Sequence, residues 1–445
     1  MIMSCQTDSK KADQLLLENK FDEAIELYKK AADVGDSYAK WRLSQCYRYG
    51  YGVDFDENIT LELLKQAAQE GCEEAKCDIA FAYMFDWLNI GEDVEKGKSI
   101  LEELIKGTEN PYVLCRYAGL LFFEGSPYEQ NKEKAMRLLD KIKDKDNPYY
   151  NYAMGEVYLF GTDKIDMDID KSIDFYTKAF NKGRRYSAYR LQSIYASGYN
   201  NAKKDLKKSV EWLNRGIESN QVDCMTEMGL LCLSEDSVVK DYNNPQRGIE
   251  LLKKASLHGD GRAYFYLGNY YNEGKYLPKD DNKAFVNWEK SANLKYKDGY
   301  TNLAYCYLQG IGCEKDKQKA IELYDKAVEK GSGFSANKLY YSYYNGVDGV
   351  KKNNEKAKKY LLKAAELNDP WGCFNLANHY YDERGLMGKD IHQAFVYFKK
   401  AADMGLVEAC GVMSYLYERG IGCDKDPDKA KEYKDMTIAK SEKEK

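Results

Sequence analysis

A unit of 36 to 39 residues recurs along almost the whole chain, and this repetition constrains the fold more than any other feature. The clearest copy, Asn302 to Gly331, predicts a helix, a loop containing Gly310 and Gly312, a second helix and a glycine stop. Nearly the same pattern returns at residues 413–439. Because such a period is typical of stacked helix pairs, the sequence predicts an all-α repeat array.

Two sets of positions mark the first helix of each unit. The set just before the loop, here called the marker positions, is tyrosine apart from two exceptions: Tyr47, Tyr83, Phe122, Tyr158, Tyr195, Cys232, Tyr271, Tyr307, Tyr343, Tyr380 and Tyr417. The apolar set lies four residues earlier: Leu43, Ile79, Ala118, Met154, Leu191, Met228, Leu267, Leu303, Leu339, Leu376 and Met413. Residues i and i+4 share one helical face, so both sets are predicted to lie in the core.

The second helix of each unit carries a small residue near its start. The members are Ala24, Thr60, Gly97, Ala135, Ser172, Ser209, Gly248, Ala284, Ala320, Ala357, Ala394 and Ala430. Such a uniform size limit predicts close contact between helix backbones. The second helix then ends at a glycine in most units and at Asn220 and Asn368 in two others, as expected for a left-handed C-terminal residue.

These motifs resemble those of a known family. The pattern Leu303-Ala304-x-x-Tyr307-x-x-Gly310-Ile311-Gly312, followed by Lys319-Ala320-Ile321-x-x-Tyr324-x-x-Ala327, closely resembles the Sel1-like repeat, a relative of the tetratricopeptide repeat. The resemblance covers roughly residues 12–440 in about eleven units. It implies a right-handed α/α superhelix that binds other proteins, with first helices lining the inner surface.

The predicted organisation is one solenoid over residues 11–440, between a flexible N-terminus (1–10) and a charged tail (441–445). Residues 11–35 form a tetratricopeptide-like cap, with a short first helix from Ala12. Residues from about 427 to 440 form a polar C-terminal capping helix, because nothing stacks beyond it. Three segments depart from the loop pattern, and their hairpin geometry stays open: 84–97, 112–145 and 224–245.

Composition limits the partners and the compartment. The net charge of −5 provides no overall basic field, so no nucleic acid is expected. No run of eighteen apolar residues predicts a membrane span, and the N-terminus has no apolar stretch of signal-peptide length. The resemblance to the Sel1-like family includes secreted proteins in which a disulfide joins the two helices of each hairpin. Such a disulfide requires one cysteine on each helix. Here none of the twelve cysteines falls on a predicted second helix, so we expect free thiols and a cytoplasmic protein.

Candidate chemical sites are weak. Cys373 and His379 could suggest a nucleophile and a base, but a spacing of six puts them on different faces of one helix. Asp166, Asp168 and Asp170 resemble the start of a calcium loop whose required glycine and glutamate are missing. No phosphate loop, CxxC pair or HExxH motif is present. We therefore expect no catalysis, no metal and no cofactor.

A second stripe on the first helices is the candidate partner site. It takes positions two before, two after and five after the apolar set, which share a helical face. The predicted contact residues are Phe265, Asn269, Asn272, Tyr305, Asn337, Tyr341, Tyr344, Phe374, Asn378 and Tyr381. Rings can cover apolar side chains of a peptide while amides bond its backbone. The alternative is that these rings only stack between adjacent first helices.

The sequence therefore favours a monomeric, non-enzymatic scaffold or adaptor that binds a peptide or protein partner in the concave groove of first helices. A second hypothesis is a regulator or assembly factor that grips one folded partner through a terminal or convex surface. A third is an enzyme with an unrecognised site. The sequence does not identify the partner.

Overall fold

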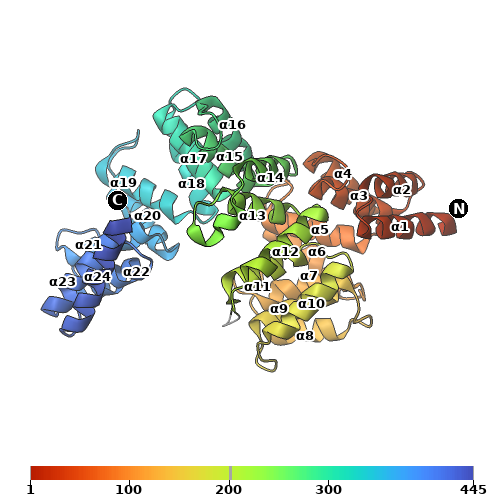
Figure 1. Cartoon of the computed structure of the whole chain (residues 1–445), viewed down its shortest axis with the longest axis horizontal. Helices are drawn as coiled ribbons and strands as arrows, with labels where there is room; N and C mark the ends of the chain where they lie inside the picture. The colour runs from red at the N-terminus through yellow and green to blue at the C-terminus, as the bar shows by residue number, and fades with distance from the viewer. Residues whose placement is uncertain (1, 200–202, 444–445) are drawn as a thin grey trace. The chain divides into compact units, whose positions relative to one another are not determined.

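The computed structural model describes residues 2–199 and 203–443, and within them the chain is all α, without strands (Figure 1). It divides into two compact units at Asp260 and Gly261. The helices of the first unit are α1 (Ile2–Leu17), α2 (Phe21–Asp33), α3 (Ser37–Tyr49), α4 (Glu57–Gln69), α5 (Glu73–Phe85), α6 (Val94–Ile105), α7 (Pro111–Phe122), α8 (Lys132–Asp140), α9 (Pro148–Phe160), α10 (Ile169–Asn181), α11 (Ser187–Ser197), α12 (Leu206–Glu218), α13 (Val222–Leu233), the 3-10 helix η2 (Ser237–Tyr242) and α14 (Pro245–Leu257). Those of the second unit are α15 (Gly261–Glu273), α16 (Asp281–Asn293), α17 (Lys297–Gln309), α18 (Lys317–Glu329), α19 (Gly333–Asn345), α20 (Asn354–Glu366), α21 (Pro370–Tyr381), α22 (Ile391–Asp403), α23 (Val407–Arg419) and α24 (Pro427–Lys443).

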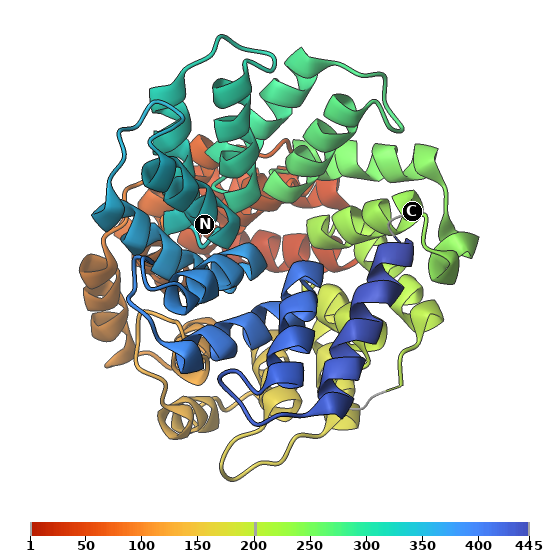
Figure 2. The same cartoon turned by 90° about the vertical axis from the view of Figure 1, so that its left-hand side faces the viewer.

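Each odd-numbered helix packs against the even-numbered helix that follows it, which confirms the predicted stack of helix hairpins. Figure 2 shows this pairing in the blue C-terminal hairpin, α23 with α24. The three segments that depart from the loop pattern also form hairpins: α5/α6, α7/α8 and α13/α14, the last with η2 in its loop.

The two ends of the array differ from the sequence prediction. Helix α1 begins at Ile2, ten residues before the predicted start at Ala12. The last helix continues to Lys443, into the segment expected to be a tail. Met1, Glu444 and Lys445 lie outside the described residues.

Close backbone contact explains the small residue on each second helix. A Cβ atom added at Gly97 would lie 2.6 Å from the carbonyl oxygen of Ala80, on the first helix of the same hairpin. At Gly248 it would lie 2.8 Å from the carbonyl oxygen of Gly229. Such distances leave no room for a larger side chain, so the column fixes how tightly each hairpin closes.

From α4 onward, each second helix begins with an aspartate or asparagine N-cap, a column that was not predicted from the sequence; α2 has Lys20 at this place and no side-chain cap. In α18, for example, the Asp316 side chain accepts a hydrogen bond from the backbone N–H of Lys319 at 2.9 Å. The Asp316 backbone N–H donates to the carbonyl oxygen of the marker residue Tyr307 at 2.9 Å. This cap satisfies an unpaired amide of the helix start and ties the loop to the end of the first helix.

Most marker tyrosines pack against the core and have a lysine ammonium over the ring. The Tyr307 ring lies edge-on to Phe285, with centroids 5.6 Å apart. Lys319, just before the small residue Ala320, places its ammonium 4.2 Å from the centroid of the Tyr307 ring and donates to the hydroxyl at 2.6 Å. The core role is as predicted, but the hydroxyl partner here is a lysine of the second helix rather than a loop carbonyl.

The first unit curls until its later hairpins meet its first ones. Asn220, after α12, donates from its side-chain amide to the carbonyl oxygen of Gly50 at 2.8 Å. Arg185, before α11, donates to the carbonyl oxygen of Leu16. These contacts join residues 169 and 170 positions apart. Repeats far apart in the sequence therefore touch within this unit, because small rotations between hairpins accumulate into a closed turn.

The part of the chain that the structure describes contains no helix with the length and apolar composition needed to cross a membrane.

Candidate functional site

Exposed aromatic side chains gather on the first helices of the second unit. Among its described residues, every exposed aromatic side chain belongs to α17, α19, α21 or α23, with exposed fractions between 39% and 58%. We call this set the aromatic stripe: Tyr305, Phe334, Tyr341, Trp371, Tyr381 and Tyr415. Large exposed apolar surface of this kind marks interaction sites more often than chance.

The structure divides the predicted contact residues by their position in the helix. Tyr305, Tyr341 and Asn378, each two residues after the apolar set, are exposed, and so is Tyr381. They are the predicted residues that a partner could reach most directly.

The aromatic residues two before the apolar set pack between helices instead. Phe265 lies 5.5 Å from Tyr296 between ring centroids, and Phe374 lies 5.4 Å from Phe398. Tyr344 is half-buried, with its ring 5.1 Å from that of His379. Of these contacts, only that of Tyr344 with His379 joins adjacent first helices, α19 and α21, as the alternative predicted; Phe398 lies on α22, the second helix of the hairpin that contains Phe374.

Two of the predicted amides already have partners. The side-chain oxygen of Asn269 accepts hydrogen bonds from Trp288 and Asn302, both at 3.0 Å. That of Asn337 accepts from Asn375 at 2.9 Å. These bonds tie first helices to their neighbours, so they leave less capacity for a peptide backbone. Asn272 is half-buried on α15.

Three members of the stripe were not among the residues predicted from the sequence: Phe334, Trp371 and Tyr415. Phe334 and Trp371 stand five residues before Leu339 and Leu376. Because this position lies seven residues, or two turns, before the exposed position two after the apolar set, both lie on one face. Tyr415 occupies that same exposed position in the last repeat. The period of the helix therefore contained the signal.

The corresponding inner positions of the first unit form buried polar networks. Asp78 on α5 is fully buried and accepts hydrogen bonds from Trp41 and Gln45 at 2.9 Å and from the Tyr112 hydroxyl at 2.5 Å. Arg116 lies 3.6 Å from the same carboxylate. These donors come from α3 and α7, so Asp78 bridges three consecutive first helices.

Glu156 on α9 forms a similar network further along the first unit. Its carboxylate accepts two hydrogen bonds from Arg190 of α11, at 2.7 and 2.5 Å, and one from the Tyr176 hydroxyl at 2.7 Å. Bidentate pairing of this type is strong and fixes geometry. Both networks join first helices of adjacent repeats, which makes them structural.

The weak chemical candidates do not assemble into a catalytic or metal site. The Sγ atom of Cys373 faces the carbonyl oxygen of Ala365 at 3.8 Å, whereas the Nε2 atom of His379 lies 2.8 Å from the Tyr340 hydroxyl. Asp168 is the N-cap of α10. Among the described residues, no group of three or more potential ligands could hold a metal ion.

The stacked hairpins, closed by small residues and, from α4 onward, by N-caps, define an α/α solenoid of the kind used for protein recognition. The family model of the Sel1 repeat matches eleven segments: 17–36, 37–72, 111–147, 148–183, 186–220, 222–260, 261–296, 297–332, 335–369, 372–406 and 407–433. The chain belongs to the Sel1 repeat family.

Several curated proteins are similar to parts of the chain. The chitin synthase regulator SKT5 of Saccharomyces cerevisiae is 28% identical over 44% of this chain and 29% of its own length. Chitin synthase regulatory factor 3 of Schizosaccharomyces pombe is 26% identical over 41% of this chain and 21% of its length. The cytochrome c oxidase assembly factor 7A of Xenopus laevis is 32% identical over 26% of this chain and 54% of its length. The matches to these two chitin synthase regulators thus span less than a third of the length of either relative.

Solved structures with this repeat are also similar. A protective antigen of uropathogenic Escherichia coli that displays an SLR fold is 23% identical, covers 92% of this chain and 86% of its own, and has a TM-score of 0.45. A Sel1 repeat protein from Oxalobacter formigenes is 22% identical over 68% of this chain and 86% of its own, with a TM-score of 0.44.

Proposed function

We propose that this protein is a non-enzymatic scaffold or adaptor that binds an extended segment of a partner protein along the first helices of the second unit. The aromatic stripe carries this proposal, because it concentrates exposed rings on the helices that line the inner surface of such superhelices. Interface energy concentrates in a few aromatic anchors, and rings of this size bury large apolar area on contact.

The chemistry of the stripe suits a peptide with apolar side chains. Tyr341 is 58% exposed, which leaves most of its ring available for contact. The exposed amide of Asn378 lies on the next first helix and can both donate to and accept from a peptide backbone. The Lys338 ammonium lies 5.2 Å from the centroid of the Phe334 ring, which adds one positive charge beside the stripe.

The relatives support a role exerted on other proteins. Two are named for regulating chitin synthase and one for assembling cytochrome c oxidase. None of these names describes a reaction catalysed by the relative itself. We infer that this chain likewise acts by binding, and that it does so as a monomer, without nucleic acid. We also propose a reducing compartment such as the cytoplasm, because the eleven described cysteines are free thiols.

Selection of displayed peptides on the purified chain tests the site. Peptides that bind the parent should lose at least about tenfold in affinity when Tyr341→Ala and Trp371→Ala are combined. The matched control combines Val286→Ala and Val396→Ala, which remove exposed apolar side chains, 44% and 42% exposed, from the second helices α16 and α22. Circular dichroism melts establish that both double variants are folded.

The same pair of variants separates the two modes of binding. If peptides bind the stripe variant as tightly as the parent and lose affinity for the second-helix variant, the partner uses the convex surface, as a regulator or assembly factor that grips a folded protein would. Retained affinity in both variants excludes both surfaces around these positions.

A further inference from the structure

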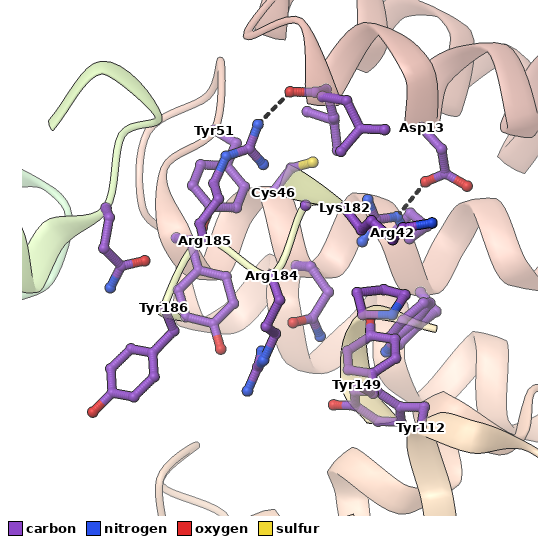
Figure 3. Close-up of a pocket in the computed structure, with 18 of the residues that line it drawn as sticks. Asp13, Arg42, Cys46, Tyr51, Tyr112, Tyr149, Lys182, Arg184, Arg185 and Tyr186 are labelled. Atoms are coloured by element: carbon purple, nitrogen blue, oxygen red, sulfur yellow. Dashed lines mark hydrogen bonds and ion pairs between the residues drawn. The ribbon is translucent and has the colours of Figure 1, made fainter. Parts of the chain in front are cut away.

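Two cavities in the first unit share three side chains: Arg116, Tyr149 and Arg184. The first, here called the arginine cavity, has a volume of ≈ 550 Å³ and is also lined by Arg42 and Arg185 (Figure 3). All its lining residues belong to the closed turn formed by hairpins α1/α2 through α13/α14. Its volume falls within the range of sites for small ligands or for a few residues of a peptide.

The second, here called the apolar cavity, has a volume of ≈ 520 Å³. Its walls come mainly from α7, α8 and α9 and include Leu139, Phe122 and Phe160; the ion pair of Glu156 with Arg190 of α11 also lines it. Phe123, which follows α7, also lines it and is 37% exposed, so this side reaches the surface. The two cavities together offer a charged compartment next to an apolar one.

Most cations of the arginine cavity already have partners. Arg42 donates to the Asp13 carboxylate at 2.7 Å, and Arg116 lies 3.6 Å from Asp78. Arg185 donates to the carbonyl oxygen of Leu16 and holds the turn closed. Their charge or hydrogen-bonding capacity is therefore partly committed to the fold.

Arg184 is different, because its side chain makes no hydrogen bond or ion pair with any residue that the structure describes. Its Nε atom is covered and unpaired, as are those of Arg116 and Arg185, but those two side chains have a partner at another nitrogen. Figure 3 shows the guanidinium directed into the space between Tyr149 and Tyr186. A buried unpaired donor costs about 1–3 kcal/mol, so this position requires an explanation that the fold alone does not supply.

Two neighbouring tyrosine rings lie within cation–π distance of the Arg184 guanidinium. Its central carbon lies 5.0 Å from the ring centroid of Tyr152 and 5.7 Å from that of Tyr149. A guanidinium stacked on rings keeps its N–H groups free in its own plane, which is the direction from which a carboxylate binds.

Tyr149, which lines both cavities together with Arg184, offers a second donor. Its hydroxyl makes no hydrogen bond with a described residue, and burial raises the pKa of this phenol. The hydroxyl therefore stays protonated at physiological pH and can donate to an anion. One uncompensated guanidinium with one neutral donor matches a single negative charge better than a phosphate dianion.

We propose that the first unit binds a ligand that joins one carboxylate to an apolar body. The carboxylate lies on the Arg184 guanidinium and the Tyr149 hydroxyl, and the apolar body occupies the cavity lined by Phe122 and Phe160. A medium-chain fatty acid and a peptide C-terminus that ends in apolar residues share this chemistry. The site lies in the first unit, so it is independent of the aromatic stripe.

Calorimetric titration of the full chain tests the proposal with four probes. Decanoate and decanamide differ only in the charged group, and so do the peptide Ala-Ala-Leu-Phe with a free C-terminus and the same peptide amidated. We expect at least one acid to bind about tenfold or more tightly than its amide. Binding of decanoate alone identifies a small-molecule site, and binding of the free peptide alone identifies a C-terminus site.

Two variants separate the two halves of the site. Arg184→Gln removes the charge and should reduce the preference for the acid to about twofold or less, whereas Arg184→Lys should retain part of it. Gly119→Leu fills the apolar cavity: a Cβ at Gly119 meets no atom within 4 Å, so the variant should fold. It should weaken the acid that binds by about tenfold or more without touching Arg184.

Arg137→Gln is the matched control, because Arg137 is an exposed arginine, paired with Glu133, outside both cavities. It should bind the acid as the parent does, and so should Tyr341→Ala in the stripe. Equal affinity of the parent for acid and amide, no binding of any probe at millimolar concentration, or unchanged acid binding by Arg184→Gln would each overturn the proposal. If Arg184→Gln does not fold, the Gly119→Leu result decides.

Discussion

Removal of the Asp78 carboxylate tests whether the inner networks hold the first unit together. In Asp78→Ala the side chains of Trp41, Gln45 and Tyr112 lose a common acceptor inside the protein, where the carboxylate is 0% exposed. Arg116 loses its nearest negative charge. The substitution therefore leaves several donors and one cation without a partner.

The magnitude follows from these contacts. Hydrogen bonds to a charged acceptor contribute about 1.5–3 kcal/mol each, and breaking a buried pair from one side costs about 3–5 kcal/mol. Because the contributions are not additive, we expect Asp78→Ala to lower the free energy of unfolding by about 3–5 kcal/mol. Asp78→Asn should cost less, about 1–3 kcal/mol, because its oxygen can still accept from Trp41 and Gln45 while its amide faces the rotatable Tyr112 hydroxyl.

Hydrogen exchange measured by mass spectrometry is the appropriate assay, because it resolves opening free energies along a repeat array. Protection should fall in peptides that cover α3, α5 and α7, whose side chains meet at Asp78, and should change least in the second unit. Asp174→Asn is the control, because Asp174 forms an exposed pair with Lys178 and should change stability by about 0.5 kcal/mol or less. If α3, α5 and α7 are as well protected from hydrogen exchange in Asp78→Ala as in the parent, the Asp78 network does not stabilise the first unit.

Three further predictions concern the hairpins and the buried histidine His379. Gly97→Ala should lower the free energy of unfolding by about 1–3 kcal/mol, because the added Cβ would lie 2.5 Å from the Cγ atom of Met84. In the control Gly119→Ala the added Cβ meets no atom within 4 Å, so this variant should be neutral or more stable by about 0.5–1 kcal/mol. Thermal melts measure both changes. Tyr307→Ala should lower the free energy of unfolding by about 2–4 kcal/mol, measured as reduced protection from hydrogen exchange in α16–α18. Equal protection in the variant and the parent would show that Tyr307 is not a core residue. Burial lowers the pKa of His379, so at acidic pH this side chain binds a proton more readily in the unfolded chain than in the folded one. The stability that neutral His379 contributes is therefore complete above the pKa of the unfolded chain. It is lost as the pH falls through the pKa of the folded chain. Urea unfolding at pH 5 and 7 should therefore show a larger loss in the parent than in His379→Leu, and equal losses would contradict this role.

Half of the aromatic stripe could be predicted from the sequence, namely Tyr305, Tyr341 and Tyr381. The positions two after the apolar set gave Tyr305 and Tyr341, which are exposed as a partner site requires. Phe374 was predicted for the same face but packs on Phe398 of α22. The helical period locates a side chain around its own helix, but neighbouring helices decide whether it is covered.

The sequence by itself determined the repeat, the hairpins and their core columns. These features depend on short-range physics: a 3.6-residue period, a left-handed stop and a size limit that Gly97 and Gly248 display at a helix contact. Only the tertiary structure decided that the first unit closes on itself, that Arg185 reaches Leu16 across 169 residues, and that Arg184 is left facing a cavity. Closure depends on a small rotation between neighbouring hairpins, summed over the whole turn, and no single repeat of the sequence encodes that sum.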